Sequence, residues 1–427
     1  MKKLLFFTTY NFIFLPLIYL FSHIGIVFSP KLRHGIIKRH LQWRTISPPD
    51  GRRVILFHTA SMGEYEHIRP LFTRIKQLLG DSVYLVNMFF SPSGYRHVSA
   101  GKEVDSVIYS PLDTPWAVWR LYRKLSPSLL VIAKHDVWPN QVMLAKAMDI
   151  PVILVNASMS SDSSRLKWWT RGIHRFFYGH IQKIYTISQT DRNNFLKLVS
   201  DERLHLAGDT KFDQVIIRKE RNRDKKFLPD KFWRDRRILV MGSIWPSDFK
   251  ILGPVIRELL PSYPDLNLLF VPHEPSEKHI LEIAGLFPDY RLYSGRNNYN
   301  GERAFVVDTI GVLADLYKYA HIAFVGGGNK EGVHNVMEAA VYGVPVLYGP
   351  NLGGSNEARE MAEREEGGHI IRNRETLRTV LTGFLNDPEK QKTAGSAALN
   401  FVMQRLGASD QVADEITKII NPNPVSD

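Results

Sequence analysis

Three loops rich in ionisable residues follow apolar stretches of the sequence, and each could carry chemistry. The first runs from His58 through small residues to Glu64, where the apolar spacing of a helix begins. A carboxylate at a helix start favours the helix dipole, which explains Glu64 without catalysis. In the functional interpretation Glu64 is a general base, and the helix amino terminus lowers its pKa so that it stays ionised and accepts a hydroxyl proton.

The other two loops of the first half also have competing interpretations. Lys134 to Asn140 holds three ionisable residues in a row before a helical pattern, and capping of that helix by Asp136 or Asn140 accounts for them structurally. Gly208 to Asp213 contains Lys211, whose ammonium group could reach a phosphate or simply contact water.

A fourth loop, in the second half, has features of a phosphate-binding turn. Gly326-Gly327-Gly328 follows an apolar run, and a helical pattern begins near Asn335. Glycines there let the backbone approach a phosphate closely. Glu331 stands where a dinucleotide fingerprint has its third glycine, and no Walker A sequence occurs, which argues against dehydrogenases and NTPases. Asn335 and Glu338 also have capping-box spacing, so a structural role competes with ligand binding.

Metal and thiol chemistry find no support in the sequence. It contains no cysteine and no two aspartates at D-x-D spacing. Disulfides and thiolate sites are excluded, and a metal-held sugar diphosphate is disfavoured. We expect no metal and no cofactor, with positive side chains and helix dipoles stabilising the charge of a departing phosphate.

Short apolar runs alternate with helical patterns in both halves and would position these loops. The runs are 54–57, 84–86, 129–132 and 152–155 in the first half, and 238–241, 268–271, 322–325 and 344–347 in the second. This alternation predicts an α/β fold of two tandem, doubly wound, parallel-sheet (Rossmann-like) domains. Ligands of such sheets bind beyond the carboxyl ends of the strands, so we expect the site between the domains.

Composition predicts how the chain divides. We expect a membrane anchor at 1–30, a first domain at 31–217, a charged linker at 218–237, a second domain at 238–420 and a frayed tail at 421–427. Residues 4–28 form 25 positions without a charged side chain, enough for a helix to cross a hydrocarbon core of about 30 Å. Polar residues within this run leave open a helix that lies in the membrane interface.

Charge indicates what the first half faces. Residues 1–225 hold 33 Lys and Arg against 17 Asp and Glu, a balance of +16, and the remainder holds 22 against 26, a balance of −4. An anionic membrane surface or a phosphorylated ligand fits this asymmetry. Nucleic acid is not predicted, because the basic residues are spread out and no zinc-finger or RNP motif occurs. The heavier positive flank after residue 28 places the body in the cytoplasm.

Taken together, these features resemble the 3-deoxy-D-manno-octulosonic acid (Kdo) transferases of lipopolysaccharide synthesis, from the anchor to about Ile371. The order and spacing of several short motifs carry the resemblance. They are His58-Thr-Ala-Ser-Met-Gly-Glu64, Ser91-Pro-Ser-Gly94, Pro111-Leu-Asp113, Trp138-Pro-Asn140, Gly208-Asp-Thr-Lys-Phe-Asp213, Asp308-Thr-Ile-Gly311 and Gly332-Val-His-Asn-Val-Met-Glu338.

The resemblance implies a GT-B fold, CMP-Kdo as donor, the lipid A precursor lipid IVA as acceptor, and inversion at the anomeric carbon. It also implies attachment by a single amino-terminal anchor to the bacterial inner membrane, with the catalytic body on its cytoplasmic face. Glu64 matches the family's proton acceptor, and Asp136 and Lys211 match positions that stabilise the transition state. The positions that match CMP contacts are His273, Glu274, Ile310, Gly311, Val312, Asn335, Val336, Met337 and Glu338.

This chain also departs from the family pattern. Lys134-His135-Asp136 stands where many members have Glu-Thr-Glu, and His273 replaces an arginine that would favour a phosphate. Two alternatives follow: a GT-B transferase that uses a UDP-sugar and a different lipid acceptor, and a membrane-associated binding protein without catalysis. The same base and donor site would serve the transfer of one, two or more Kdo residues.

Overall fold

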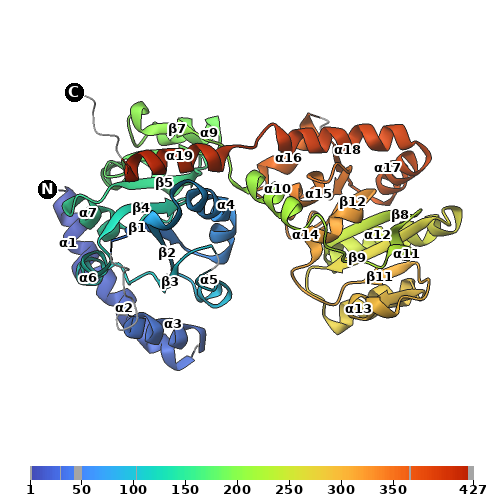
Figure 1. Cartoon of the computed structure of the whole chain (residues 1–427), viewed down its shortest axis with the longest axis horizontal. Helices are drawn as coiled ribbons and strands as arrows, with labels where there is room; N and C mark the ends of the chain where they lie inside the picture. The colour runs from blue at the N-terminus through green and yellow to red at the C-terminus, as the bar shows by residue number, and fades with distance from the viewer. Residues whose placement is uncertain (1, 29, 43–50, 102, 365–366, 422–427) are drawn as a thin grey trace. The chain divides into compact units, whose positions relative to one another are not determined.

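Two seven-stranded sheets, one in each half of the chain, organise the computed structural model (Figure 1). It describes residues 2–28, 30–42, 51–101, 103–364 and 367–421. The chain divides into an N-terminal unit, Met1–Gln214 with Leu406–Asp427, and a C-terminal unit, Val215–Arg405. The paired strands of both sheets are parallel, which confirms the predicted doubly wound α/β fold.

The sheet of the N-terminal unit has the order β3-β2-β1-β4-β5-β6-β7. Its strands are β1 Arg53–Thr59, β2 Val83–Phe89, β3 Ser106–Tyr109, β4 Pro127–Ala133, β5 Val152–Ala157, β6 Lys183–Thr186 and β7 Leu204–Leu206. The helices are α1 Lys2–Thr9, the π-helix η1 Tyr10–Phe14, α2 Leu15–Phe28, α3 Pro30–Leu41, α4 Met62–Leu79, α5 Pro92–His97, α6 Pro115–Leu125, α7 Pro139–Ala147, α8 Arg171–Tyr178, α9 Gln189–Phe195, α10 Lys211–Arg221 and α19 Ala408–Ile420. Short 3₁₀ turns lie at Gly80–Ser82, Ser164–Leu166 and Asp201–Arg203.

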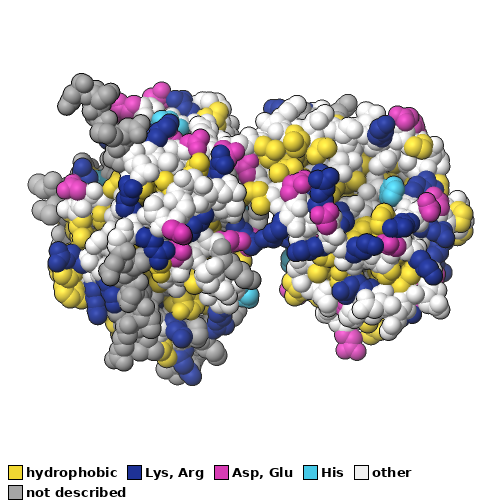
Figure 2. Space-filling model, in the orientation of Figure 1, with side chains coloured by type: hydrophobic (Ala, Val, Ile, Leu, Met, Phe, Trp, Pro, Cys, Tyr) yellow, Lys and Arg dark blue, Asp and Glu magenta, His cyan; other side chains and the backbone are white. Residues whose placement is uncertain are grey.

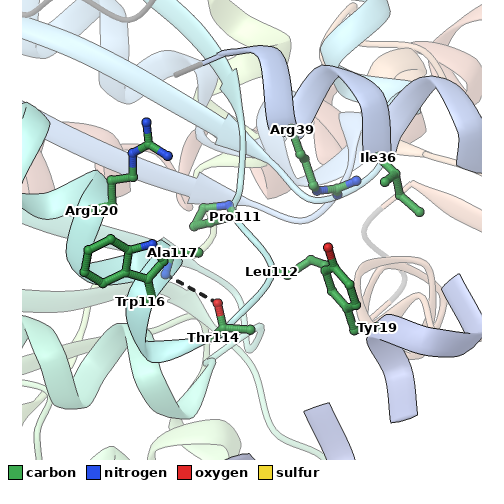
Figure 3. Close-up of a pocket in the computed structure, with 9 residues that line it drawn as sticks. All are labelled: Tyr19, Ile36, Arg39, Pro111, Leu112, Thr114, Trp116, Ala117 and Arg120. Carbon is green, nitrogen blue, oxygen red and sulfur yellow. Dashed lines mark hydrogen bonds between the residues drawn. The ribbon is translucent and has the colours of Figure 1, made fainter. Parts of the chain in front are cut away.

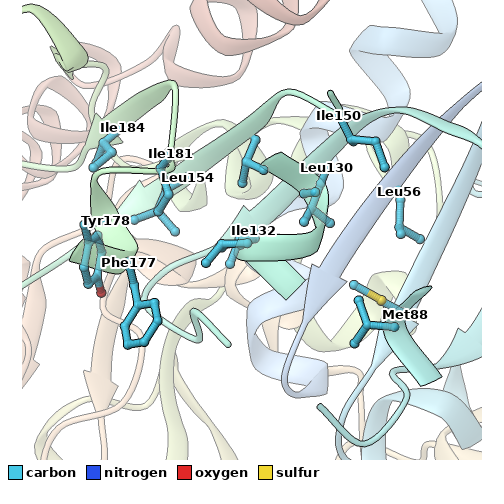
Figure 4. Close-up of a cluster of buried hydrophobic side chains, with 14 of the residues drawn as sticks. Leu56, Met88, Leu130, Ile132, Ile150, Leu154, Phe177, Tyr178, Ile181 and Ile184 are labelled. Atoms are coloured by element: carbon cyan, nitrogen blue, oxygen red, sulfur yellow. The ribbon is translucent and has the colours of Figure 1, made fainter. Parts of the chain in front are cut away.

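Both faces of this sheet are buried. Leu56 belongs to one hydrophobic cluster, whereas its neighbours Ile55 and Phe57 belong to another. Successive side chains of a strand point to opposite faces, so each cluster fills one face. Figure 4 shows the first cluster, in which Leu56, Leu130 and other strand residues pack against helical side chains. The carboxyl ends of the central strands are thereby fixed by a core on either side.

The first 28 residues pack partly against this unit and do not form the predicted membrane-spanning helix. Phe6 contacts Phe177 with ring centroids 5.5 Å apart, and the Tyr10 hydroxyl donates to Asp113 Oδ2 at 2.8 Å. Within the described residues, no helix is long and apolar enough to cross a membrane. Tyr10 and Leu15 of this segment are buried against the unit, so part of its apolar surface serves packing within the protein.

The C-terminal unit repeats the architecture, with the strand order β10-β11-β9-β8-β12-β13-β14. Its strands are β8 Arg237–Ile244, β9 Leu266–Pro272, β10 Tyr290–Leu292, β11 Ala304–Val306, β12 Ile322–Val325, β13 Val346–Tyr348 and β14 Gly368–Ile370. Its helices are α11 Asp230–Trp233, α12 Pro246–Leu259, α13 Glu277–Leu286, α14 Leu313–Leu316, α15 Met337–Ala340, α16 Asn356–Glu363, α17 Arg374–Asn386 and α18 Pro388–Met403. 3₁₀ turns lie at Leu260–Ser262, Tyr293–Asn298 and Tyr317–Tyr319.

The boundaries differ from the prediction in two places. Helix α19, expected in the second domain, lies with the N-terminal unit beside α4 (Figure 1). Its apolar face joins the cluster that holds Ile68 and Leu71, and Asp213 accepts hydrogen bonds from the amides of Gly407 and Ser409 at its start. Residues 218–237 are not a free linker, because they contain the end of α10, α11 and the start of β8. The predicted frayed tail, apart from Asn421, lies outside the described residues.

The packing of α19 makes its buried residues important for stability. We expect Ile416→Ala to lower the free energy of unfolding by about 2–4 kcal/mol, because Ile416 is fully buried in the cluster of the N-terminal unit. Asp414→Ala, on the exposed side of the same helix, should change it by less than about 0.5 kcal/mol. Urea unfolding followed by circular dichroism measures both. Equal effects of the two substitutions would contradict the packing.

Candidate active site

A buried carboxylate and a histidine–aspartate pair lie at the carboxyl edge of the N-terminal sheet. Asp136 follows β4, and its Oδ2 lies 2.8 Å from His58 Nε2 near the end of β1. The Trp138 indole N–H donates to the same oxygen at 3.0 Å. Burial alone would raise the pKa of Asp136. The hydrogen bond and charge of His58 and the hydrogen bond of Trp138 outweigh burial and hold this pKa below its usual value. Asp136 is therefore an ionised, oriented carboxylate.

Glu64 lies in the first turn of α4 and is 8 % exposed. Its Oε2 accepts a hydrogen bond from the Ala60 amide, which turns the side chain back over its own loop. Burial raises the pKa of Glu64; the Ala60 amide opposes this, and the charge of Asp136 adds to the rise. The prediction that the helix start would lower this pKa is therefore wrong, because loss of solvent outweighs the helix dipole. A raised pKa suits a group that takes up a proton.

Two neighbours of Glu64 received no role in the sequence interpretation. His58 is fully buried and partners Asp136, and the positive charge of Lys134 opposes the rise in the pKa of Glu64. Lys134 has φ of 60°, in the left-handed region, immediately after β4. The sequence could have revealed His58, because a polar residue near the end of a buried strand needs a hydrogen-bond partner. The signal for Lys134 was its departure from the acidic family pattern.

Lys211 begins α10, and its Nζ lies 3.3 Å from Asp209 Oδ2. The loop that carries it is tied to α4, because the Thr210 hydroxyl donates to the His67 carbonyl. The Asn156 side-chain amide also donates to the Thr210 hydroxyl, at 2.6 Å. The first contact attaches the loop to α4, one turn after Glu64, and the second attaches it to β5. The part Lys211 plays in catalysis stays a prediction.

In the C-terminal unit, three aromatic rings stack beyond β8, β9 and β12. His273 lies between Trp245 and His334, with ring centroids 4.4 Å and 4.5 Å away. The Trp245 indole N–H donates to His334 Nε2 at 3.0 Å, so this nitrogen carries no proton. Burial, and then the charge of His273, lower the pKa of His334. The exposed His273 is therefore held by stacking at the edge where the donor contact was predicted.

Asp248 organises the loops of this edge and was missed by the sequence interpretation. It is fully buried in α12 and accepts hydrogen bonds from the amides of Trp245 and Gly327 at 2.9 and 2.7 Å, and from the Asn329 side chain at 2.8 Å. Asp248 stands three residues after Trp245, which precedes α12. An acid at this spacing is a helix-capping signal, and it could have revealed Asp248 from the sequence.

The glycine run fits closely against neighbouring backbone. A Cβ on Gly326 would lie 2.3 Å from the Ser243 carbonyl oxygen, and one on Gly328 would lie 2.6 Å from the Gly349 amide nitrogen. Close packing of loops therefore explains these two glycines, where the sequence suggested space for a phosphate. The helix expected near Asn335 begins at Met337 and is four residues long.

The other predicted donor residues occupy two further loops of this unit. Asn335 Oδ1 accepts the Met337 amide at 3.2 Å, and Asn335 Nδ2 donates to Glu338 Oε1 at 3.4 Å. The residue at the N-cap of α15 is Val336, so the capping box expected from the spacing does not form. The Val336 and Met337 side chains are fully buried, which leaves only their backbone for a ligand. Glu274 is exposed, as are Ile310 and Gly311, and Val312 is half-buried. Contact of these residues with a donor stays a prediction.

Removing Asp248 should disorganise the loops at this edge of the C-terminal sheet. We expect Asp248→Ala to lower the melting temperature by several degrees, because it leaves two buried amides without an acceptor, at about 1–3 kcal/mol each. Nucleotide affinity, measured by calorimetry, should fall with it. Asp224→Ala, at an exposed position of the same unit, is the control. An unchanged melting temperature and affinity would contradict this role of Asp248.

The described residues contain no group of three or more His, Cys, Asp or Glu that could hold a metal ion. The polar groups described at the two edges are carboxylates, imidazoles, Lys134, Lys211 and backbone amides.

Similarity to known proteins agrees with this architecture. The UDP-GlcNAc 2-epimerase of Neisseria meningitidis has a TM-score of 0.62 at 14% identity, with 86% of this chain and 100% of that chain covered. A glycosyltransferase from Rickettsia africae has a TM-score of 0.54 at 13% identity, with 87% and 100% covered. These likenesses show the fold, two tandem parallel α/β units of the GT-B type.

Comparison of the sequence with known proteins points to one kind of transferase. Residues 33–214 match the family model "3-Deoxy-D-manno-octulosonic-acid transferase (kdotransferase)". The 3-deoxy-D-manno-octulosonic acid transferase of Haemophilus influenzae is 28% identical over 98% of this chain and 99% of its own length. That of Aquifex aeolicus is 27% identical over 77% and 85%. Most of this chain is therefore similar in sequence to Kdo transferases.

Proposed function

We propose that this protein transfers Kdo from CMP-Kdo to a 6-position hydroxyl of lipid IVA, with inversion at the anomeric carbon. The observation that carries the proposal is the buried Glu64 carboxylate beside the His58–Asp136 pair, in a chain similar to Kdo transferases. Burial raises the pKa of Glu64, so it is a stronger base than an exposed glutamate once ionised.

The proposed reaction is a single displacement. The acceptor hydroxyl oxygen attacks the anomeric carbon and forms the new glycosidic bond, while the bond from that carbon to the phosphate oxygen of CMP breaks. The hydroxyl proton passes to Glu64, and CMP leaves with the bonding electron pair. Asp136 stabilises positive charge that develops on the sugar, and Lys211 stabilises negative charge. Attack opposite the leaving group inverts the anomeric centre.

The donor is assigned to the C-terminal unit. His273, held in the stack with Trp245, is proposed to face the CMP phosphate, and Glu274 is the adjacent predicted contact with CMP. Residues 310–312 and 335–338 supply the remaining predicted contacts, the latter through backbone amides where the side chains are buried. No cofactor is needed in this scheme, because CMP-Kdo is a co-substrate.

The acceptor is assigned to the basic N-terminal unit at the cytoplasmic surface of the bacterial inner membrane. Lipid IVA bears two phosphates, which fits the +16 balance of residues 1–225. The π-helix η1 and helix α2 bury Tyr10 and Leu15 in the unit and expose Phe12, Ile13, Leu20 and Phe21. Such a face supports attachment in the membrane interface.

Mass spectrometry of lipid IVA incubated with CMP-Kdo and the purified protein tests the proposal. We expect the lipid to gain one or more Kdo increments, and their number gives the number of transfers. Incubation without CMP-Kdo is the control. Unmodified lipid, with donor and acceptor recovered intact, would contradict the proposed substrates.

Inhibition by free nucleotides tests the donor separately. CMP should inhibit at much lower concentration than UDP if the C-terminal unit recognises cytidine. The reverse order would favour the alternative of a GT-B transferase that uses a UDP-sugar.

A further inference from the structure

A cavity of about 280 Å³ opens in the N-terminal unit between α2, α3 and α6. Figure 3 shows Tyr19 and Ile36 on one side of it and Trp116 and Arg120 on the other, with Pro111 and Leu112 between them. Arg39, Thr114 and Ala117 complete the lining. The lining is thus mainly apolar and aromatic, with two arginines, which is the chemistry of a site for an anionic amphiphile.

Arg39 is the unusual residue of this cavity. Its guanidinium donates to the backbone carbonyl oxygens of Ser110 and Phe90 and lies over the rings of Phe90 and Tyr109 at 5.2 and 4.8 Å. Among the described residues, no carboxylate forms an ion pair with it. Burial lowers the pKa of Arg39 to about 10. A half-buried cation without an acidic partner is costly unless an anion completes the site.

The surface around the cavity has the composition of a membrane interface. Helix α6 buries Val118 and Leu121 in the core but leaves Trp116 67 % exposed, and Trp116 stacks on Trp119 with centroids 4.9 Å apart. The guanidinium of Arg123 lies 5.8 Å from the Trp119 ring. Tryptophan beside arginine is typical of the headgroup level of a bilayer.

Helix α2 continues this surface with exposed apolar side chains. They are Leu17, Ile18, Tyr19, Leu20, Phe21 and Ile24. Figure 2 shows Lys and Arg side chains among hydrophobic ones on the drawn face of the N-terminal unit. A soluble anion would leave the apolar strip uncovered, whereas a lipid would place its phosphate at Arg39 and its chains along α2.

We propose that the cavity between α2, α3 and α6 binds the phosphate of an anionic membrane phospholipid, with Arg39 as its principal ligand and Trp116 at the level of the glycerol. Glu64, His58 and Asp136 do not line the cavity, and the proposed ligand is not the substrate of the transfer reaction. It would hold the N-terminal unit at the bilayer in one orientation.

Vesicle sedimentation tests the proposal with phosphatidylcholine vesicles that contain or lack phosphatidylglycerol. The wild-type chain should bind the anionic vesicles more tightly. Arg39→Gln should weaken that binding about tenfold, because it removes a charge-assisted contact to phosphate. Ala117→Phe should do the same by filling the cavity while it leaves Arg39 and its hydrogen bonds in place. Arg257→Gln, an exposed arginine of the C-terminal unit, should change binding by less than about twofold.

The outcomes distinguish lipid binding in the cavity from general charge attraction and from binding of a soluble anion. If Arg39→Gln does not fold, Ala117→Phe alone decides. Wild-type affinity of Ala117→Phe, or an equal loss in Arg257→Gln, would show that general charge attraction and not the cavity binds the membrane. Binding of inorganic phosphate without vesicles that is lost in Ala117→Phe, together with equal sedimentation of this variant and the wild type on anionic vesicles, would assign the cavity to a soluble anion and overturn the lipid. Kdo transfer to detergent-dispersed acceptor is measured separately, so a wrong substrate would leave this result unaffected.

Discussion

Glu64→Gln is expected to reduce kcat/KM for sugar transfer by about 10³-fold while leaving the protein at least as stable as the wild type. The size of the loss follows from removal of a general base, which contributes about 10²–10⁴-fold. The stability follows from burial: the carboxylate is 8 % exposed and its pKa is raised, so the charged form is disfavoured in the folded state. Glutamine has nearly the same shape and carries no charge.

Initial rates with CMP-Kdo and lipid IVA, together with thermal unfolding, test this prediction. Glu66→Gln is the matched control, because Glu66 lies two residues further along α4 and contacts Arg69 and Gln214 at the surface. It should retain activity within about threefold. A Glu64→Gln protein with wild-type turnover would remove Glu64 from the mechanism, whereas loss of both activity and stability would indicate a structural role.

The pH dependence of the rate gives an independent test of the same base. Glu64 works only when ionised, and burial raises its pKa, so the rate should fall with decreasing pH at a higher pH than for an ordinary glutamate near 4.3. Rates over a pH series, with buffers matched in ionic strength, measure this acid limb. A limb at or below the ordinary value would mean that a different group accepts the proton.

The sheets were predictable from sequence because buried parallel strands are continuous apolar runs. The eight predicted runs all lie on strands or overlap them, and they place Glu64 and Asp136 after neighbouring strands β1 and β4. Adjacent strands bring their following loops together, so the meeting of these two acids followed from chain order and topology.

The missed features depend on contacts between segments far apart in sequence. The apolar face of α19 predicts a helix but not the unit it packs on, and its contact with α4 exists only in the folded chain. The 25-residue apolar stretch gave no sign of the π-helical turn, nor of the hydrogen bond from Tyr10 to Asp113 that holds it on the unit. A count of apolar residues cannot distinguish a buried face from a lipid-facing one.

The pKa of Glu64 shows the same limit for electrostatics. A helix start is readable from sequence, and alone it lowers the pKa of a carboxylate. Burial is not readable at one residue, because it depends on the surrounding loops. Here burial is the larger effect and the pKa rises.

Asp136→Asn is the second substitution with a large expected effect, a fall in kcat of about 10²-fold. The amide oxygen can still accept hydrogen bonds from His58 and Trp138, so the loop should keep its shape. What is lost is the negative charge, which we propose stabilises the positive charge that develops on the sugar. Asp162→Asn, an exposed aspartate of the same unit, should retain activity within about twofold.

A pH series separates this electrostatic role from a purely structural one. The charge of Asp136 helps to raise the pKa of Glu64, so its removal should lower that pKa and move the acid limb of the rate to lower pH. The base would then be ionised over a wider range while the maximal rate is smaller. Damage to the fold predicts a smaller rate with an unmoved limb. A limb that stays in place, or an undiminished rate, would therefore show that Asp136 and Glu64 do not act as one electrostatic unit.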